Sequence, residues 1–157
     1  MQKKIIVGIC YYTGSEVSKA VRRIKHFIPC VVHQAMSTES LEIVFDAIAG
    51  DDTSIHIIDH IRSIEEMTYL KRVFPNDTIE FIGIEVHYED RYRNLLAKRW
   101  IEKYPTPKQW YDVFRNEPCE RNVEKCLERI AFEHVFKYQY GSHNAVIGQM
   151  ADLISLM

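Results

Sequence analysis

Two glycines and a serine stand at a predicted strand-to-helix junction in the segment Val7–Lys19. In a phosphate-binding loop, glycines let backbone N–H groups converge on an anion, a lysine neutralises the β and γ phosphates, and a serine or threonine hydroxyl reaches magnesium. Gly8, Gly14 and Ser15 match parts of this pattern, but the Gly-Lys-Ser/Thr core is absent and the glycine spacing is one residue longer than standard. The segment therefore predicts a phosphate-binding loop without its lysine.

Lys19 is the nearest replacement for the absent lysine, because it lies about one turn inside the helix expected to start at Ser15. Its ammonium group has to reach back along that helix to meet a phosphate. In the alternative interpretation, Gly14 and Ser15 only turn the chain and cap the helix, while Tyr11 and Tyr12 fill the space of the phosphates. The sequence leaves both interpretations open.

Short apolar strands alternate with amphipathic helices along the chain. The expected strands are 4–10, 29–33, 54–61, 78–87 and 134–140, and the expected helices are 15–26, one between 37 and 50, 63–74, 89–100, 108–115 and 145–156. This alternation predicts an α/β fold in which a mostly parallel five-stranded sheet, with the first strand central, carries helices on both faces. Ligands of such sheets bind at the carboxyl ends of the strands, here around 10–15, 59–62 and 87–91.

The composition excludes several classes of protein. The chain has 157 residues, of which 46% are hydrophobic and 27% charged, and this predicts one globular domain over residues 1–157. The net charge of -2 is spread along the sequence, so we expect no nucleic-acid partner. No apolar run approaches the roughly 20 residues of a membrane helix, and we expect no membrane partner. A cytoplasmic protein with reduced thiols and no metal cage of protein ligands is the expectation from the cysteine and histidine spacing.

Four further segments carry recognisable patterns. Ile55–Glu66 reads IHIIDHIRSIEE, and Val86–Arg99 is a strand that leads into a helix with spaced arginines. Arg115–Glu117 and the small turn Gly141–Ser142 follow. In this order, over nearly the whole chain, they resemble a subgroup of P-loop kinases that contains dephospho-CoA kinase-like proteins, archaeal nucleotide kinase-like proteins and phage deoxynucleoside monophosphate kinases. The resemblance implies a three-layer P-loop kinase-like fold.

The resemblance also implies an activity, namely phosphoryl transfer from ATP, with magnesium, to a nucleotide or nucleotide-like acceptor. It implies that Asp59 acts in catalysis, orienting the acceptor or joining Ser15 in holding magnesium, and that Arg62 binds the acceptor phosphate. In the alternative interpretation Asp59 caps the next helix and Arg62 pairs with Glu65 or Glu66 on the surface. Both interpretations remain open at this stage.

Three of the four arginines in the segment 91–118, which the resemblance implies is a small helical lid, are candidate site residues. Arg91 and Arg93 would bind phosphate, and Arg99 would act in catalysis by neutralising the transferred phosphoryl group. The alternative is a solvated helix face whose arginines pair with neighbouring carboxylates. A homodimer is expected of this fold group.

The chain departs from the subgroup in three places. It lacks the loop lysine, it has His60 where the subgroup has glycine, and its segment 29–50 is shorter than the usual acceptor-binding region. These departures favour a second class of function. In that class the chain is a catalytically inactive binding or regulatory module that works through a protein or nucleotide partner.

Overall fold

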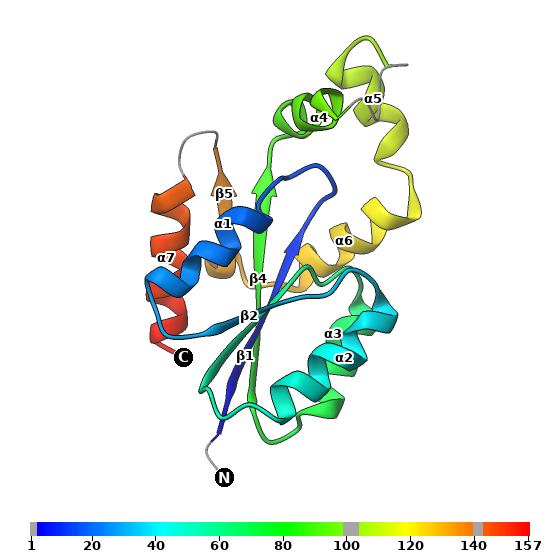
Figure 1. Cartoon of the computed structure of the whole chain (residues 1–157). Helices are drawn as coiled ribbons and strands as arrows, with labels where there is room; N and C mark the ends of the chain where they lie inside the picture. The colour runs from blue at the N-terminus through cyan, green and yellow to red at the C-terminus, as the bar shows by residue number, and fades with distance from the viewer. Residues whose placement is uncertain (1–2, 99–103, 140–142) are drawn as a thin grey trace.

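The computed structural model describes residues 3–98, 104–139 and 143–157. Within these ranges it holds one five-stranded parallel sheet with the order β2-β3-β1-β4-β5 (Figure 1). The strands are β1 (Ile5–Tyr11), β2 (Val31–Gln34), β3 (Ile55–Asp59), β4 (Thr78–Val86) and β5 (Val135–Tyr138). The predicted parallel sheet is confirmed, and β1 is central because it pairs with β3 on one side and β4 on the other.

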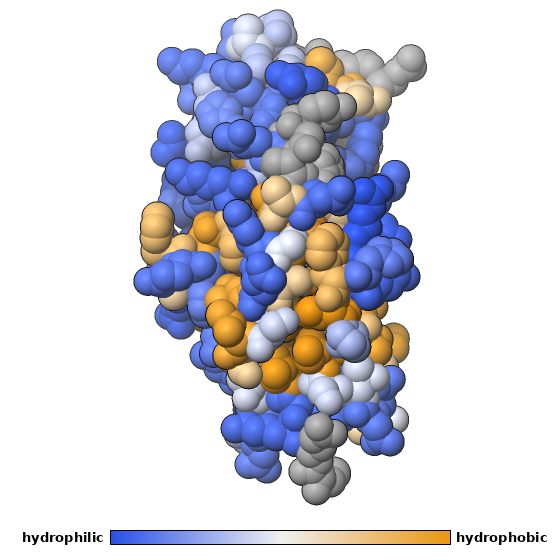
Figure 2. Space-filling view, turned by 90° about the vertical axis from the view of Figure 1, so that its left-hand side faces the viewer, coloured by the Kyte–Doolittle hydropathy of each residue, from blue (hydrophilic) through white to orange (hydrophobic). Residues whose placement is uncertain are grey.

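One face of the sheet is covered by three helices. These are α1 (Ser18–Arg22), the 3-10 helix η1 (Arg23–His26) and α7 (His143–Ser155) (Figure 1). Alternate residues of β1 point to this face, where Val7, Ile9 and Tyr11 are buried. Figure 2 shows apolar residues gathered in the lower half of this side of the molecule. The partly buried apolar residues of this layer include Ile5, Val32, Ile55, Leu153 and Met157.

The other face is covered by α2 (Thr38–Ala49), α3 (Ile64–Val73) and α6 (Pro118–Arg129) (Figure 1). Ile6 and Cys10 of β1 point to this layer and are fully buried in it. Ser37 caps α2, because its side chain and Ser40 form a reciprocal capping box. Ser63 caps α3 by accepting a 3.2 Å hydrogen bond from the backbone N–H of Glu66. The chain therefore has helices on both faces of its sheet, as predicted.

Two helices stand beyond the carboxyl edge of the sheet. They are α4 (Tyr88–Ala97) and α5 (Pro107–Phe114), and they pack around Tyr92, Leu95 and Trp110 (Figure 1). They make up much of the segment 91–118, whose role as a lid stays a prediction. A short 3-10 helix, η2 (Phe132–His134), follows α6 and leads into β5. None of the described helices combines the length and the apolar composition that crossing a membrane requires.

Two helices differ from the expectation. The helix expected to start at Ser15 starts at Ser18, because Glu16 has a φ of 58° and this left-handed conformation interrupts a helix. The 12-residue helix α6 was not predicted at all. The sequence nevertheless contains signals for this helix, since Pro118 occupies a first-turn position and the apolar residues Val123 and Cys126 follow at helical spacing.

Candidate phosphate-binding site

The turn after β1 is held by α4. Gly14 has a φ of +83°, and a Cβ atom at this position would lie 2.9 Å from Cγ of Leu95. The side-chain amide of Asn94 donates a 2.9 Å hydrogen bond to the carbonyl oxygen of Gly14. Glycine is therefore required here both by the left-handed backbone and by the close approach of α4.

Ser15 and Gly8 have local roles in this structure. The Ser15 side chain is buried, and its hydroxyl donates a 2.6 Å hydrogen bond to the carbonyl oxygen of Tyr12. The expectation that Ser15 caps the helix is wrong, since the N-cap of α1 is Val17. Gly8 lies inside β1, where an added Cβ would meet Ile61 at 2.7 Å. Its small size lets the chain after β3 pack closely on β1.

A cavity of about 350 Å³ lies beside this turn, and its wall holds Lys19, Arg22, Lys98 and Glu16. Lys98 forms an ion pair with Glu16, which balances one positive charge. Lys19 and Arg22 are exposed and lie three residues apart on α1, so both reach the same side of that helix. The cavity therefore has an excess of positive charge at the edge of the sheet where α/β proteins bind ligands.

Tyr11 and His60 form a wall of this cavity. Their rings stack with centroids 4.4 Å apart and an interplanar angle of 10°. The Tyr11 hydroxyl donates a 2.8 Å hydrogen bond to Oδ1 of Asp59 and lies 2.8 Å from the hydroxyl oxygen of Ser18. Burial, and next the Asp59 carboxylate, raises the pKa of Tyr11 well above its ordinary value, so the phenol stays protonated and keeps this bond.

A second cavity, of about 250 Å³, lies on the other side of this wall. It shares Tyr11, Ser18 and His60 with the first cavity and adds Asp59 and Arg62. Asp59 is the last residue of β3, and its side chain is almost fully buried. The two cavities therefore lie side by side at the carboxyl edge of the sheet, separated by the stacked rings.

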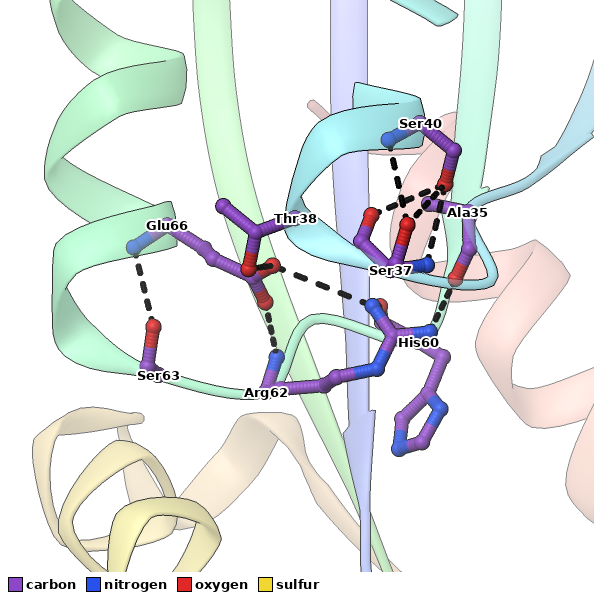
Figure 3. Close-up of polar contacts among 8 residues, drawn as sticks. All are labelled: Ala35, Ser37, Thr38, Ser40, His60, Arg62, Ser63 and Glu66. Carbon is purple, nitrogen blue, oxygen red and sulfur yellow. Dashed lines mark hydrogen bonds and ion pairs between the residues drawn. The ribbon is translucent and has the colours of Figure 1, made fainter. Parts of the chain in front are cut away.

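Arg62 is held by backbone and carboxylate oxygens around the second cavity (Figure 3). Its guanidinium donates to the carbonyl oxygens of Ala35 and His60 and lies 3.8 Å from Oε2 of Glu66. Glu66 is itself buried, and it accepts a 2.6 Å bond from the Arg62 backbone N–H and a 3.0 Å bond from the Thr38 hydroxyl. The structure thus contains the predicted alternative pairing of Arg62 with Glu66, but in a buried network and not on an open surface.

Two further alternatives are resolved by these contacts. Asp59 does not cap α3, because Ser63 is the N-cap residue of that helix. Arg93 is 71% exposed and lies 3.4 Å from Asp90, which is the solvated pairing that the sequence left open. Arg99 lies outside the described residues, as does the turn at Gly141–Ser142.

Arg91 is buried and faces the turn from α4. Its Nη2 donates a 2.6 Å bond to Oε2 of Glu120, and its Nε donates a 3.0 Å bond to the carbonyl oxygen of Thr13. The guanidinium also lies over the rings of Tyr12 and Trp110, at 4.6 Å and 5.3 Å. With these partners Arg91 joins α4, α6 and the turn after β1, and it is not among the residues that line the first cavity.

Ser15 and Asp59, which the resemblance implies hold magnesium, both make hydrogen bonds within the protein. The Ser15 hydroxyl is used within its turn, and Oδ1 of Asp59 accepts the Tyr11 hydroxyl. Among the described residues, no group of three or more His, Cys, Asp and Glu side chains is placed to hold a metal ion. The magnesium role of Ser15 and Asp59 therefore stays a prediction, and Asp59 is a carboxylate on the wall of the second cavity.

Sequence reasoning missed several residues at this edge. Arg22 and Lys98 line the first cavity, and Glu120 pairs with Arg91. For Arg22 a signal was present, because it follows Lys19 at helical spacing. For Glu120 there was none, since only burial distinguishes it from the many exposed acids of the chain. Glu66 was a predicted partner of Arg62, but the sequence did not show that it is buried.

Comparison with known proteins extends the assignment of the fold. No family model matches this sequence, and no curated protein matches it. The solved structure of APE1195 is similar at a TM-score of 0.56 and 13% identity, covering 100% of this chain and 98% of that one. A gluconokinase from Sinorhizobium meliloti 1021 is similar at a TM-score of 0.47 and 9% identity, covering 98% of this chain and 92% of that one. At these identities the likeness shows the fold alone, and the predicted α/β fold class, a parallel five-stranded sheet with helices on both faces, is confirmed.

The burial of the stacked His60 ring leads us to expect that the free energy of unfolding falls in acid. Burial, and next the Arg62 charge, lowers the pKa of His60 from 6.5 to about 4, so the unfolded chain takes up the proton first. The stability contributed by the neutral ring is therefore complete above pH 6.5 and falls as the pH is lowered towards about 4. We expect urea denaturation to show a smaller loss between these pH values in His60→Asn, because asparagine tolerates the φ of 77° and does not titrate there. Equal losses in both proteins would contradict this assignment; His33 and His56, whose pKa values burial also lowers, are present in both.

Proposed function

We propose that this chain binds a phosphorylated small molecule of the nucleotide type in the cavity beside the turn after β1. The observation that carries the proposal is the grouping of Lys19, Arg22 and Lys98 around one cavity of about 350 Å³. A volume of this size falls within the roughly 300–1,000 Å³ of small-molecule sites. The cavity also lies at the carboxyl edge of a parallel sheet, where such sheets bind ligands.

The phosphate in this proposal is neutralised by side chains of α1 and not by a loop lysine. Lys19 supplies an ammonium donor and Arg22 a planar guanidinium, which suits the oxygens of a phosphate. Lys98 approaches from the end of α4, and its ion pair with Glu16 is exchanged for the ligand's charge. The absence of the Gly-Lys-Ser/Thr core is therefore compatible with anion binding, because three cations replace one.

Phosphoryl transfer is a second candidate function, favoured by the neighbouring cavity. Asp59 and Arg62 line that cavity, where an acceptor's hydroxyl and phosphate would meet a carboxylate and a guanidinium. The Tyr11–His60 stack separates the two cavities, so transfer requires these rings to move aside. This barrier, together with the buried Ser15 hydroxyl, makes binding without rapid transfer the function that the geometry supports best.

Calorimetry with ATP, with and without magnesium, tests the proposal on the native chain and on the double variant Lys19→Ala/Arg22→Ala. Loss of two charge-assisted contacts is expected to weaken binding by at least about tenfold. Lys25→Ala, an exposed lysine of η1 outside the cavity wall, is the matched control and should bind as the native chain does. Equal affinity of the double variant, or no heat from the native chain at millimolar ATP, would overturn the proposal.

The same samples separate the two candidate functions. After incubation with ATP and a panel of nucleoside monophosphates, chromatography reports any transferred phosphate. Transfer that Asp59→Asn abolishes without loss of ATP binding would establish the second candidate. Binding without measurable transfer would leave the binding function alone.

A further inference from the structure

The free edge of β4 is a feature that the proposed function does not use. β4 pairs with β1 along Thr78–Ile84, but β5 pairs with β4 only from Gly83 to Val86. In the part of the chain that the structure describes, no strand covers the outer edge of the stretch Thr78–Ile82. A strand edge of this kind is a template for pairing with another extended chain.

The hydrogen-bonding groups of this edge can be assigned from the pairing. The backbone N–H of Thr78 donates a 2.9 Å bond to the carbonyl oxygen of Lys4, on the β1 side. Because backbone groups of successive strand residues point to opposite edges, those of Ile79 and Phe81 point outwards. Each of these two residues offers one N–H and one C=O to an incoming strand.

A cavity of about 310 Å³ lies against the same edge, and Ile79, Glu80 and Phe81 form one of its walls. Met67 and Ile130, from α3 and the end of α6, add apolar surface to it. The outward-facing backbone therefore borders a space that receives side chains, which is the arrangement by which domains recognise an extended peptide.

Charge indicates what kind of peptide fits. Two of the residues that line the cavity, Lys71 and Arg129, are cationic, and Glu80 is the single acidic residue among them. The Lys71 ammonium is held 5.6 Å above the ring of Phe81, at the pairing edge itself. A second copy of this chain is a poor occupant, because antiparallel self-pairing centred on Glu80 places the two Glu80 carboxylates opposite each other.

We propose that the free edge of β4 binds an extended acidic segment of another protein as an added strand. The partner's backbone pairs with Ile79 and Phe81, and its acidic side chains meet Lys71 and Arg129. This site lies on the α3 and α6 side of the sheet and shares no lining residue with the two cavities at the carboxyl edge. The proposal is thus independent of the proposed phosphate site.

A random 12-residue peptide display library, selected on the native full chain, provides the probe. We expect enrichment of peptides in which Asp or Glu alternates with β-branched residues. The best peptide, labelled with fluorescein, is then titrated by anisotropy against the native chain and against Lys71→Glu/Arg129→Glu. Reversing both charges is expected to weaken binding by at least about tenfold. Arg23→Glu/Lys25→Glu, on exposed residues of η1, is the matched control and should leave the affinity unchanged.

Two readouts distinguish strand addition from simple charge attraction. A peptide N-methylated at alternate residues keeps its charge but loses donors, and it should bind at least about tenfold more weakly. Hydrogen exchange of the backbone at Ile79 and Phe81 should slow when the unmodified peptide binds. The proposal is overturned if no peptide is enriched, if the charge-reversed protein binds equally well, if methylation in both alternating registers has no effect, or if the protein alone is a dimer that Lys71→Glu/Arg129→Glu dissociates.

Discussion

Replacing Glu120 with alanine is expected to lower the free energy of unfolding by about 3–5 kcal/mol, because it leaves the Arg91 guanidinium charged and buried without its carboxylate. Arg91 is 2% exposed and Glu120 is 3% exposed, and their 2.6 Å contact joins α4 to α6. Urea denaturation followed by circular dichroism measures the loss. Glu124→Ala is the matched control, since this glutamate pairs with Arg121 on the exposed side of the same helix.

The control variant should lower the free energy of unfolding by less than about 1 kcal/mol, because an exposed ion pair usually contributes no more than this. The double variant Arg91→Met/Glu120→Leu should recover part of the loss, because it removes both buried charges together. A loss in Glu120→Ala no greater than in Glu124→Ala would contradict the assignment. Because Arg91 also donates to the carbonyl oxygen of Thr13, we further expect Glu120→Ala to weaken phosphate binding at the turn.

Replacing Glu66 with alanine is expected to lower the free energy of unfolding by about 3 kcal/mol, since it leaves donors of two segments, at Thr38 and at Arg62, without their acceptor. The carboxylate accepts from the Arg62 backbone N–H and the Thr38 hydroxyl, and the Arg62 guanidinium is close to it (Figure 3). It therefore joins the starts of α2 and α3 to the end of β3. Thermal and urea denaturation measure the effect.

Two variants sharpen this second prediction. Glu65→Ala removes the neighbouring exposed carboxylate and should change stability by less than about 0.5 kcal/mol. Glu66→Gln keeps the shape and one acceptor oxygen, so its loss should be smaller than that of alanine. If Glu66→Ala were as stable as Glu65→Ala, the network around Arg62 would not be a structural anchor.

The order and type of most elements were determined by local sequence. The run from Ile5 to Cys10 is apolar throughout, as is typical of a strand covered on both faces, and β1 is central. Ser37 and Ser63 mark the starts of α2 and α3 because a side-chain oxygen satisfies a free backbone donor at that position. Such signals act between residues a few positions apart, so a sequence displays them directly.

The neighbours of the site residues were decided by the tertiary structure alone. Arg91 was predicted to face phosphate, but packing of α6 brings Glu120 to it from 29 residues away. Tyr11 meets Asp59 across 48 residues because β1 and β3 are adjacent strands. Local sequence patterns do not show which buried charged side chains pair with each other, since this pairing depends on how the layers pack. The sequence by itself therefore determined the parallel sheet and most of its helices, while the packing determined which side chains lie together at the carboxyl edge of the sheet.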